Sequence, residues 1–249
     1  MAKGRSVVTN HVAGAGAGGQ AGSASLSRAS DAKTFPELKQ YMDSQWNVTM
    51  RSDLQNCDFE YVRAAAQSVE DILTEFPQAA GVLHDIGTQV KGNEYAHATY
   101  NGTVNVSPSK FRNGSVLESK YKTDLFQKFH PKGTTAKNIV DHELGHLLER
   151  ALIRKAVIAD PNAMPWTGAD MWNKNVQAKA VISEACKAVK KTPGGKGRKN
   201  DEIIQHVSRY ATKNRSETLA ECVADYRANG DNARQLSKEV WAILKRELG

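Results

Sequence analysis

The chain has few cysteines and no long apolar segment, and both absences limit what it can be. Among its 249 residues are three cysteines, Cys57, Cys186 and Cys222, which lie far apart and form no C-x-x-C pair. An odd number of separated cysteines argues against a disulfide framework or a sulfur-ligated metal site, so we expect free thiols in a reducing compartment. No run approaches the roughly 18 apolar residues of a membrane-spanning helix. The N-terminus is basic but lacks an apolar core segment, so we expect no secretion signal.

Aromatic residues are also sparse, at 7%, and residues 1–33 contain none. Gly, Ala and Ser dominate that stretch. Such a composition buries too little apolar surface to offset the entropy of ordering, so residues 1–33 are predicted to be a disordered arm. Residues 34–249 are long enough for one good-sized domain.

Positive charge is in excess, with a formal net charge of +7. Part of it gathers in one run of basic residues: Lys187, Lys190, Lys191, Lys196, Arg198 and Lys199. The run is rich in Pro and Gly and has no aromatic residue, which is typical of a solvated loop. Nucleic-acid binding is the alternative, and it requires the charge to be gathered on one face.

The most informative motif is His142-Glu143-Leu144-Gly145-His146, which reads H-E-x-x-H. Residues four apart lie on the same face of an α-helix, so both imidazoles can reach one metal ion while Glu143 reaches a water beside it. Apolar residues recur with helical spacing on another face, namely Val140, Leu144, Leu147, Leu148 and Ala151. The sequence therefore predicts a helix whose core-facing stripe leaves the two histidines on a different face.

Residues around the motif support this helix. Thr134 or Thr135 is predicted to be its N-cap. Gly145, between the two histidines, permits the close approach of a neighbouring backbone or ligand.

A catalytic zinc ion takes three protein ligands and keeps one position open, so the motif needs a third ligand. Glu217 and Glu221 lie on a second predicted helix, for which Ser216 is the expected N-cap. Because they are four apart, one can bind the metal while the other accepts a hydrogen bond from a ligand histidine. Cys222 points about 100° away around this helix and is not a candidate ligand.

The remaining elements are predicted from periodicity and turn residues. Helices are expected at 35–42 and 59–76, strands at 46–50, 87–90, 94–100 and 103–107, and a polar loop with one helical turn at 113–132. Asn101-Gly102 is a strong hairpin signal between the last two strands. His97 and His130 are interpreted as surface or packing residues.

Two blocks of the sequence resemble zincin-like peptidase domains. H-E-x-G-H, followed downstream by a tyrosine, six residues, a glutamate, three residues and a second glutamate, is similar to the catalytic domain of anthrax lethal factor. The stretches His130-Pro-Lys-Gly-Thr134 and Tyr210-Ala-Thr-Lys-Asn-Arg-Ser-Glu217 resemble the zincin-like domains of bacteriophage minor head (capsid-associated) proteins. The resemblance covers residues 36–249 and is strong at the two motif blocks. It departs from the family in the long insert at 155–205.

The resemblance implies an α+β zincin-like metallopeptidase fold, in which a small mixed sheet places a hairpin beside the active-site helix. It implies a gluzincin-like zinc endopeptidase whose metal ligands are His142, His146 and Glu217. Glu143 would then be the general base, Tyr210 would support the oxyanion, and Glu221 would orient a ligand histidine. The implied origin is a phage or prophage, with the protein in the cytoplasm or the virion. The implied partners are a protein or peptide substrate and phage capsid or portal proteins.

Two alternatives remain open at this point. The chain could be a phage head protein whose zincin-like domain binds metal without cleaving peptides. A structural zinc site of that kind has a fourth protein ligand, for which Glu221, Asp225 and His206 are the candidates. A non-catalytic site needs neither Glu143 nor Tyr210, so their presence favours the peptidase. A toxin that attacks a host protein is the third possibility.

Overall fold

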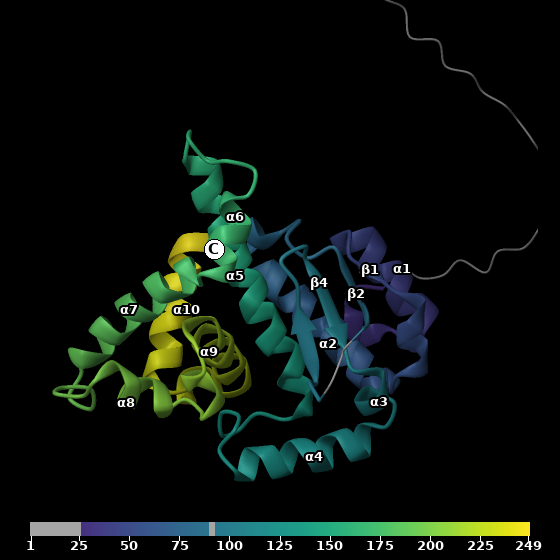
Figure 1. The fold of residues 1–249 in the computed structure, drawn as a ribbon. Helices are drawn as coiled ribbons and strands as arrows, with labels where there is room; N and C mark the ends of the chain where they lie inside the picture. Colours follow the sequence, from purple (N-terminus) through teal and green to yellow (C-terminus); the bar gives the residue numbers. More distant parts are fainter. Residues whose placement is uncertain (1–25, 90–92) are drawn as a thin grey trace, which may run out of the picture.

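The structure, a computed structural model, describes residues 26–89 and 93–249. A long helix, α5 (Ile139–Ala159), runs through the middle of the molecule. Figure 1 shows a small sheet with its helices on one side of α5, and helices from the C-terminal part of the chain on the other.

The elements divide between these two sides. Before α5 come α1 (Phe35–Trp46), β1 (Thr49–Met50), α2 (Phe59–Glu75), β2 (Asp85–Thr88), β3 (Ala96–Ala98), β4 (Thr103–Val106), α3 (Pro108–Phe111) and α4 (Gly114–Phe126). After α5 come α6 (Thr167–Asn173), α7 (Val176–Lys190), α8 (Asn200–Gln205), α9 (Arg215–Asn229) and α10 (Gln235–Leu248). The predicted α+β class is confirmed.

The sheet has four strands in the order β1-β2-β4-β3. β1, β2 and β4 are parallel, whereas β3 is antiparallel to β4, so the sheet is mixed as predicted. The predicted hairpin is present, and Gly102 supplies its turn with a φ of +86°. A side chain at Gly102 would also collide with the Val82 carbonyl oxygen, which explains why glycine is needed there.

β3 is an edge strand. Tyr95, just before it, accepts a backbone hydrogen bond of 2.8 Å from the residue after β4, and Thr99, just after it, donates one of 2.9 Å to the first residue of β4. Alternate residues of an antiparallel strand direct their backbone groups to opposite sides. Ala96 and Ala98 therefore direct their N–H and C=O groups toward the open edge of the sheet.

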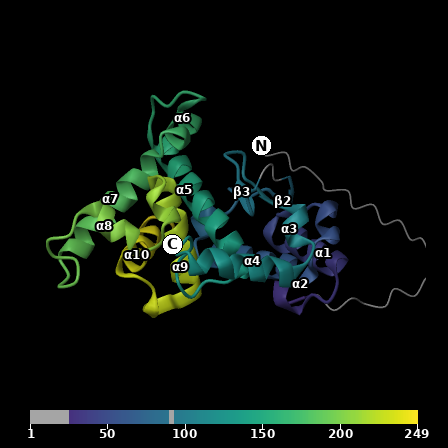
Figure 2. The same ribbon diagram turned by 60° about the horizontal axis from the view of Figure 1, so that its bottom comes forward.

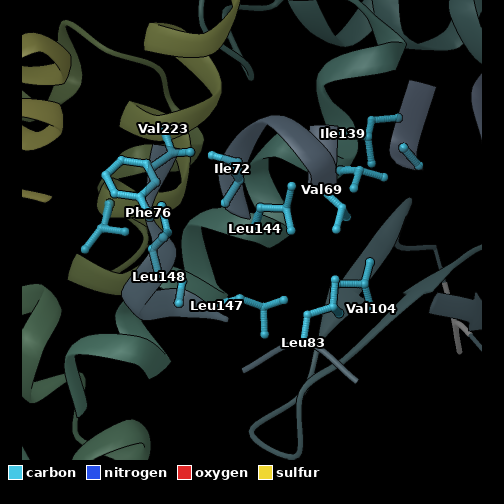
Figure 3. Packing of buried hydrophobic residues seen from close by; sticks show 14 of the residues in the cluster. Val69, Ile72, Phe76, Leu83, Val104, Ile139, Leu144, Leu147, Leu148 and Val223 are labelled. Carbon is cyan, nitrogen blue, oxygen red and sulfur yellow. The ribbon is translucent and has the colours of Figure 1, made fainter. Parts of the chain in front are cut away.

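The hydrophobic core lies between α5, α2 and the sheet. The predicted apolar stripe of α5 is fully buried: Val140, Leu144, Leu147, Leu148 and Ala151 are each at most 4% exposed. Figure 3 shows the leucines packed among Val69 and Ile72 of α2 and Val104 of β4. The predicted helix at 59–76 is thus confirmed as α2. Because the apolar stripe of α5 faces the core, His142 and His146 lie on a different face of this helix.

Two predictions about helix starts and loops were wrong. The helix cap of α5 is Asn138, because Thr135 begins a short 3-10 turn, Ala136–Asn138, that runs directly into α5. The polar stretch at 113–132 contains a full helix, α4, which lies across the N-terminal end of α5 (Figures 1 and 2). Its only buried residues are Gly114, Leu117 and Tyr121, so the sequence carries a weak apolar pattern there.

The boundaries of three other segments also differ. The strand predicted at 46–50 is limited to Thr49–Met50, because α1 continues through Trp46. The strand predicted at 87–90 lies two residues earlier, as β2, and Val90 is outside the described residues. Of the predicted arm, residues 1–25 also lie outside them, but Ala29 and Ala32 are buried, and the Ala29 amide donates to Glu70.

Two features expected from the composition concern the cysteines and the length of apolar helices. Cys57, Cys186 and Cys222 are all free thiols. None of the helices in residues 26–89 and 93–249 is long and apolar enough to cross a membrane.

Candidate metal centre

The centre is built where α5 and α9 pack against each other. α5 carries His142, Glu143 and His146, and α9 carries Glu217 and Glu221. Gly145 allows the contact: a Cβ placed there would stand 2.6 Å from the Cα of Ala220. The predicted close approach at Gly145 is thus confirmed, and it brings the first turns of α9 against the histidines.

Three side chains converge on one point between the two helices. The candidate ligand atoms of His142, His146 and Glu217 all lie within 4.8 Å of one another. The Glu217 Oε2 atom is 3.1 Å from His142 Nε2 and 3.4 Å from His146 Nε2. Two imidazole nitrogens and one carboxylate oxygen are a donor set that zinc accepts in proteins. The residues present therefore fit a metal ion.

The charges of this cluster also suit a cation. Burial opposes ionisation of Glu217, but hydrogen bonds with His142 and His146 hold its pKa well below the usual range. Burial likewise opposes the charge of His142, yet its hydrogen bonds to Glu217 and Glu221 raise its pKa well above the ordinary 6.5. Without a metal, the His142 proton supplies the positive charge that the two carboxylates require.

Glu221 lies behind His142 and does not join the three converging atoms. Its Oε1 is 2.8 Å from His142 Nδ1, so it accepts the proton on the nitrogen that faces away from the cluster. His130 Nδ1 lies 3.5 Å from the same oxygen, and its ring stacks on Tyr121 at 4.6 Å. Burial opposes the charge of Glu221, but the two imidazoles lower its pKa to about 2.

His146 is connected by hydrogen bonds to a different pair of residues, Ser216 and Glu149. Its Nδ1 lies 2.9 Å from Ser216 Oγ, and that hydroxyl donates to Glu149 Oε2 at 2.5 Å. The prediction that Ser216 is the N-cap of α9 is wrong, and its hydroxyl contacts His146 and Glu149 instead. The cap is Asn214, whose side chain accepts the Glu217 amide at 3.0 Å.

Tyr210 stands on the other side of Glu217. Its hydroxyl donates to Glu217 Oε1 at 3.2 Å and accepts from Lys213 Nζ at 2.9 Å. Lys213 also donates to Glu217 Oε1 at 3.0 Å, so this oxygen is held away from the histidines while Oε2 faces them. Burial is the main cause that raises the pKa of Tyr210, which keeps the phenol protonated.

The cluster lies in a cleft of about 660 Å³. β3 lines one wall through Ala96, His97 and Ala98, and Trp172 of α6 is also part of the lining. Glu143 lines the cleft too; it is 6% exposed and forms no side-chain hydrogen bond with the described residues. Its carboxylate is therefore available to a ligand in the cleft.

The other predicted candidates are placed outside the cluster. Asp225 is fully buried and engaged by Arg234 and Ser237. His206 is exposed and lines a separate cavity with Lys128 and Arg198. Within the part of the chain that the structure describes, no fourth His, Cys, Asp or Glu joins the three ligand candidates.

Sequence reasoning missed Glu149, Lys213 and the role of Ser216. Glu149 carried a signal, because it lies three residues after His146 and therefore on the same face of the predicted helix. The contact of Ser216 with His146 depends on how the two helices cross, which no local pattern reports. No family model, no curated protein and no solved structure matches the chain.

Proposed function

We propose that the protein is a zinc-dependent endopeptidase with a zincin-like fold. The observation that carries this proposal is the convergence of His142, His146 and Glu217 in an open cleft, with Glu143 beside them and no fourth ligand among the described residues. A structural zinc site is closed by four protein ligands, whereas a catalytic site has three and keeps one position open. This difference favours a catalyst over a metal-binding head protein that cleaves nothing.

The chemistry that a bound zinc ion supplies is Lewis acidity toward a carbonyl oxygen and toward water. Glu143 acts as general base: it accepts a proton from the attacking water and delivers it to the leaving amine. Its lack of a hydrogen-bond partner in the described residues suits this role, because no contact must be broken first.

Tyr210 donates a hydrogen bond to the oxyanion that develops on the scissile carbonyl. The hydroxyl is held at the cleft by Lys213 and Glu217, and it stays protonated because burial raises its pKa. Its one proton turns from Glu217 Oε1 to the oxyanion, while Lys213 continues to hold that carboxylate oxygen.

An extended peptide fits the open edge of β3. Within residues 26–89 and 93–249, no strand pairs with the Ala96 and Ala98 backbone groups at that edge, and an extended peptide can bind there as an added strand. Main-chain pairing of this kind recognises a peptide irrespective of its side chains. The substrate class is therefore proposed to be an extended peptide segment.

The proposal includes an origin in a phage or prophage and association with capsid or portal proteins. The resemblance of His130–Thr134 and Tyr210–Glu217 to minor head proteins supports it. Copurification with assembled capsids is the observation that tests this part.

The function is tested by incubating the zinc-loaded protein with a random peptide library and reading the products by mass spectrometry. We expect cleavage by the wild type and none by Glu143→Gln, with equal zinc content in both. Cleavage that survives in Glu143→Gln would exclude the mechanism. A zinc-loaded wild type that cleaves no peptide would exclude the peptidase.

A further inference from the structure

We propose that Glu149 and Ser216 are positioning residues that fix the proton of the His146 imidazole on Nδ1 and so reserve its Nε2 for the metal. The inference rests on the proposed metal site. The buried Glu149 carboxylate determines which ring nitrogen of His146 carries the proton. It acts through the Ser216 hydroxyl, which lies between the carboxylate and the imidazole.

The geometry forms a continuous chain of hydrogen bonds. His146 Nδ1 is 2.9 Å from Ser216 Oγ, and Ser216 Oγ is 2.5 Å from Glu149 Oε2. Ser216 and Glu149 are 8% and 1% exposed, so water does not compete for these contacts.

The direction of each bond follows from the protons available when Glu149 is ionised. An ionised carboxylate can only accept, so the one Ser216 proton points to Glu149 Oε2. Ser216 Oγ must then accept from His146, which requires a proton on Nδ1. A metal ligand must be a neutral imidazole, which has only this one ring proton, so in the metal-bound protein the Nε2 lone pair of His146 is left for the metal.

The carboxylate is held in place by the insert at 155–205. Glu149 Oε1 accepts the Ala178 amide, in the first turn of α7, at 3.2 Å. The first amides of a helix have no partner within the helix, and the α7 cap residue Asn175 provides no side-chain bond. Both oxygens of Glu149 thus face donors, and α7 fixes the group on which His146 depends.

The two ligand histidines are therefore supported in different ways. His142 donates directly to Glu221, whereas His146 reaches its glutamate through a hydroxyl. Loss of an outer contact to a ligand histidine typically costs roughly 10–100-fold in metal affinity. We expect the same range for the chain through Ser216.

A simpler role is possible for Glu149, namely capping α7. Ser216→Ala separates the two roles, because it removes the link to His146 and leaves the Glu149–Ala178 contact intact. If capping were the whole role, this variant would bind zinc like the wild type.

The experiment measures zinc affinity by competition with a chelator for the full chain, Ser216→Ala, Glu149→Gln and the double variant. Glu184→Gln is the matched control, since Glu184 lies on the exposed side of α7 and pairs with Arg246. We expect each single variant to weaken zinc binding by roughly 10–100-fold. The double variant should lose no more than the larger single effect, because both residues act in one chain.

A second readout follows the proton itself. In the zinc-loaded wild type, the His146 Nδ1–H signal should exchange slowly with water in NMR spectra, and in Ser216→Ala it should exchange fast. Unchanged zinc affinity in Ser216→Ala, or effects that multiply in the double variant, would overturn this inference and leave the proposed peptidase intact. A wild type that binds no zinc would overturn both.

Discussion

Gly145 of α5 lies so close to Ala220 of α9 that a Cβ on Gly145 would stand 2.6 Å from the Ala220 Cα. The crossing point of the two helices is therefore inside the H-E-x-x-H motif, between its histidines. Glu217 and Glu221 are on either side of Ala220, and this contact sets their distance from the imidazoles. The glycine thus connects the packing of the core to the geometry of the candidate metal centre.

Substitution Gly145→Ala should destabilise the fold and weaken the site. Forcing an extra methyl group into a packed contact typically lowers the free energy of unfolding by about 1–3 kcal/mol. The atom that the new methyl group would meet is the Ala220 Cα, which belongs to the backbone and cannot rotate away as a side chain can. Urea unfolding measures the change. Gly194→Ala is the control, because a Cβ at Gly194 meets nothing within 4 Å. Equal unfolding midpoints for Gly145→Ala and the wild type would contradict the close contact.

Substitution Tyr210→Phe should slow peptide cleavage without removing the metal. The hydroxyl contacts Glu217 only through Oε1, the oxygen that faces away from the histidines, and Lys213 continues to hold that oxygen. Loss of one oxyanion donor lowers turnover by roughly 10²–10³. The turnover number and the zinc content of both proteins check this. A loss of zinc in Tyr210→Phe would instead assign the tyrosine to metal binding.

Zinc affinity should rise with pH. The pKa of His142 lies well above 6.5 in the metal-free protein, so zinc must displace a proton from it. Affinity then increases by up to about tenfold per pH unit while one proton is released. Chelator competition in steps of one pH unit upward from 6.5 measures the slope. An affinity that does not change over these steps would contradict the raised pKa.

The same proton stabilises the metal-free fold. Because the folded-state pKa of His142 is raised, its contribution is fully present below the unfolded-state pKa near 6.5 and is lost as pH rises through the folded-state value. The metal-free protein should therefore unfold at lower urea concentration as pH rises above 6.5. Zinc should remove this dependence, since it replaces the proton.

Much of the fold could be predicted from local patterns. The apolar stripe of α5 and the Asn101-Gly102 turn are periodic or short-range signals, and both are confirmed. Helix α4 was missed because its apolar residues do not gather on one face: Leu117 and Tyr121 are buried, whereas Val116 and Phe126 are exposed. The parallel pairing of β2 with β4 joins segments far apart in the chain, and no local pattern specifies it.

In the candidate site, too, local patterns predicted what depends on one helix but not what depends on the packing of two. H-E-x-x-H predicted two converging histidines, because their spacing is a property of one helix. The choice between Glu217 and Glu221 was open, since both lie on one face of α9. Where the helices cross at Gly145, Glu217 faces both Nε2 atoms and Glu221 faces the Nδ1 of His142, which favours Glu217 as the candidate ligand.

The most direct test of the account is the zinc content, by elemental mass spectrometry, of the wild type, Glu217→Ala and Glu221→Ala after saturation with zinc and removal of the excess. We predict one zinc per chain in the wild type, none in Glu217→Ala, and retained but weaker binding in Glu221→Ala. A wild type that holds no zinc would contradict the account. So would a Glu217→Ala variant that keeps zinc while Glu221→Ala loses it, because the ligand would then be the other glutamate.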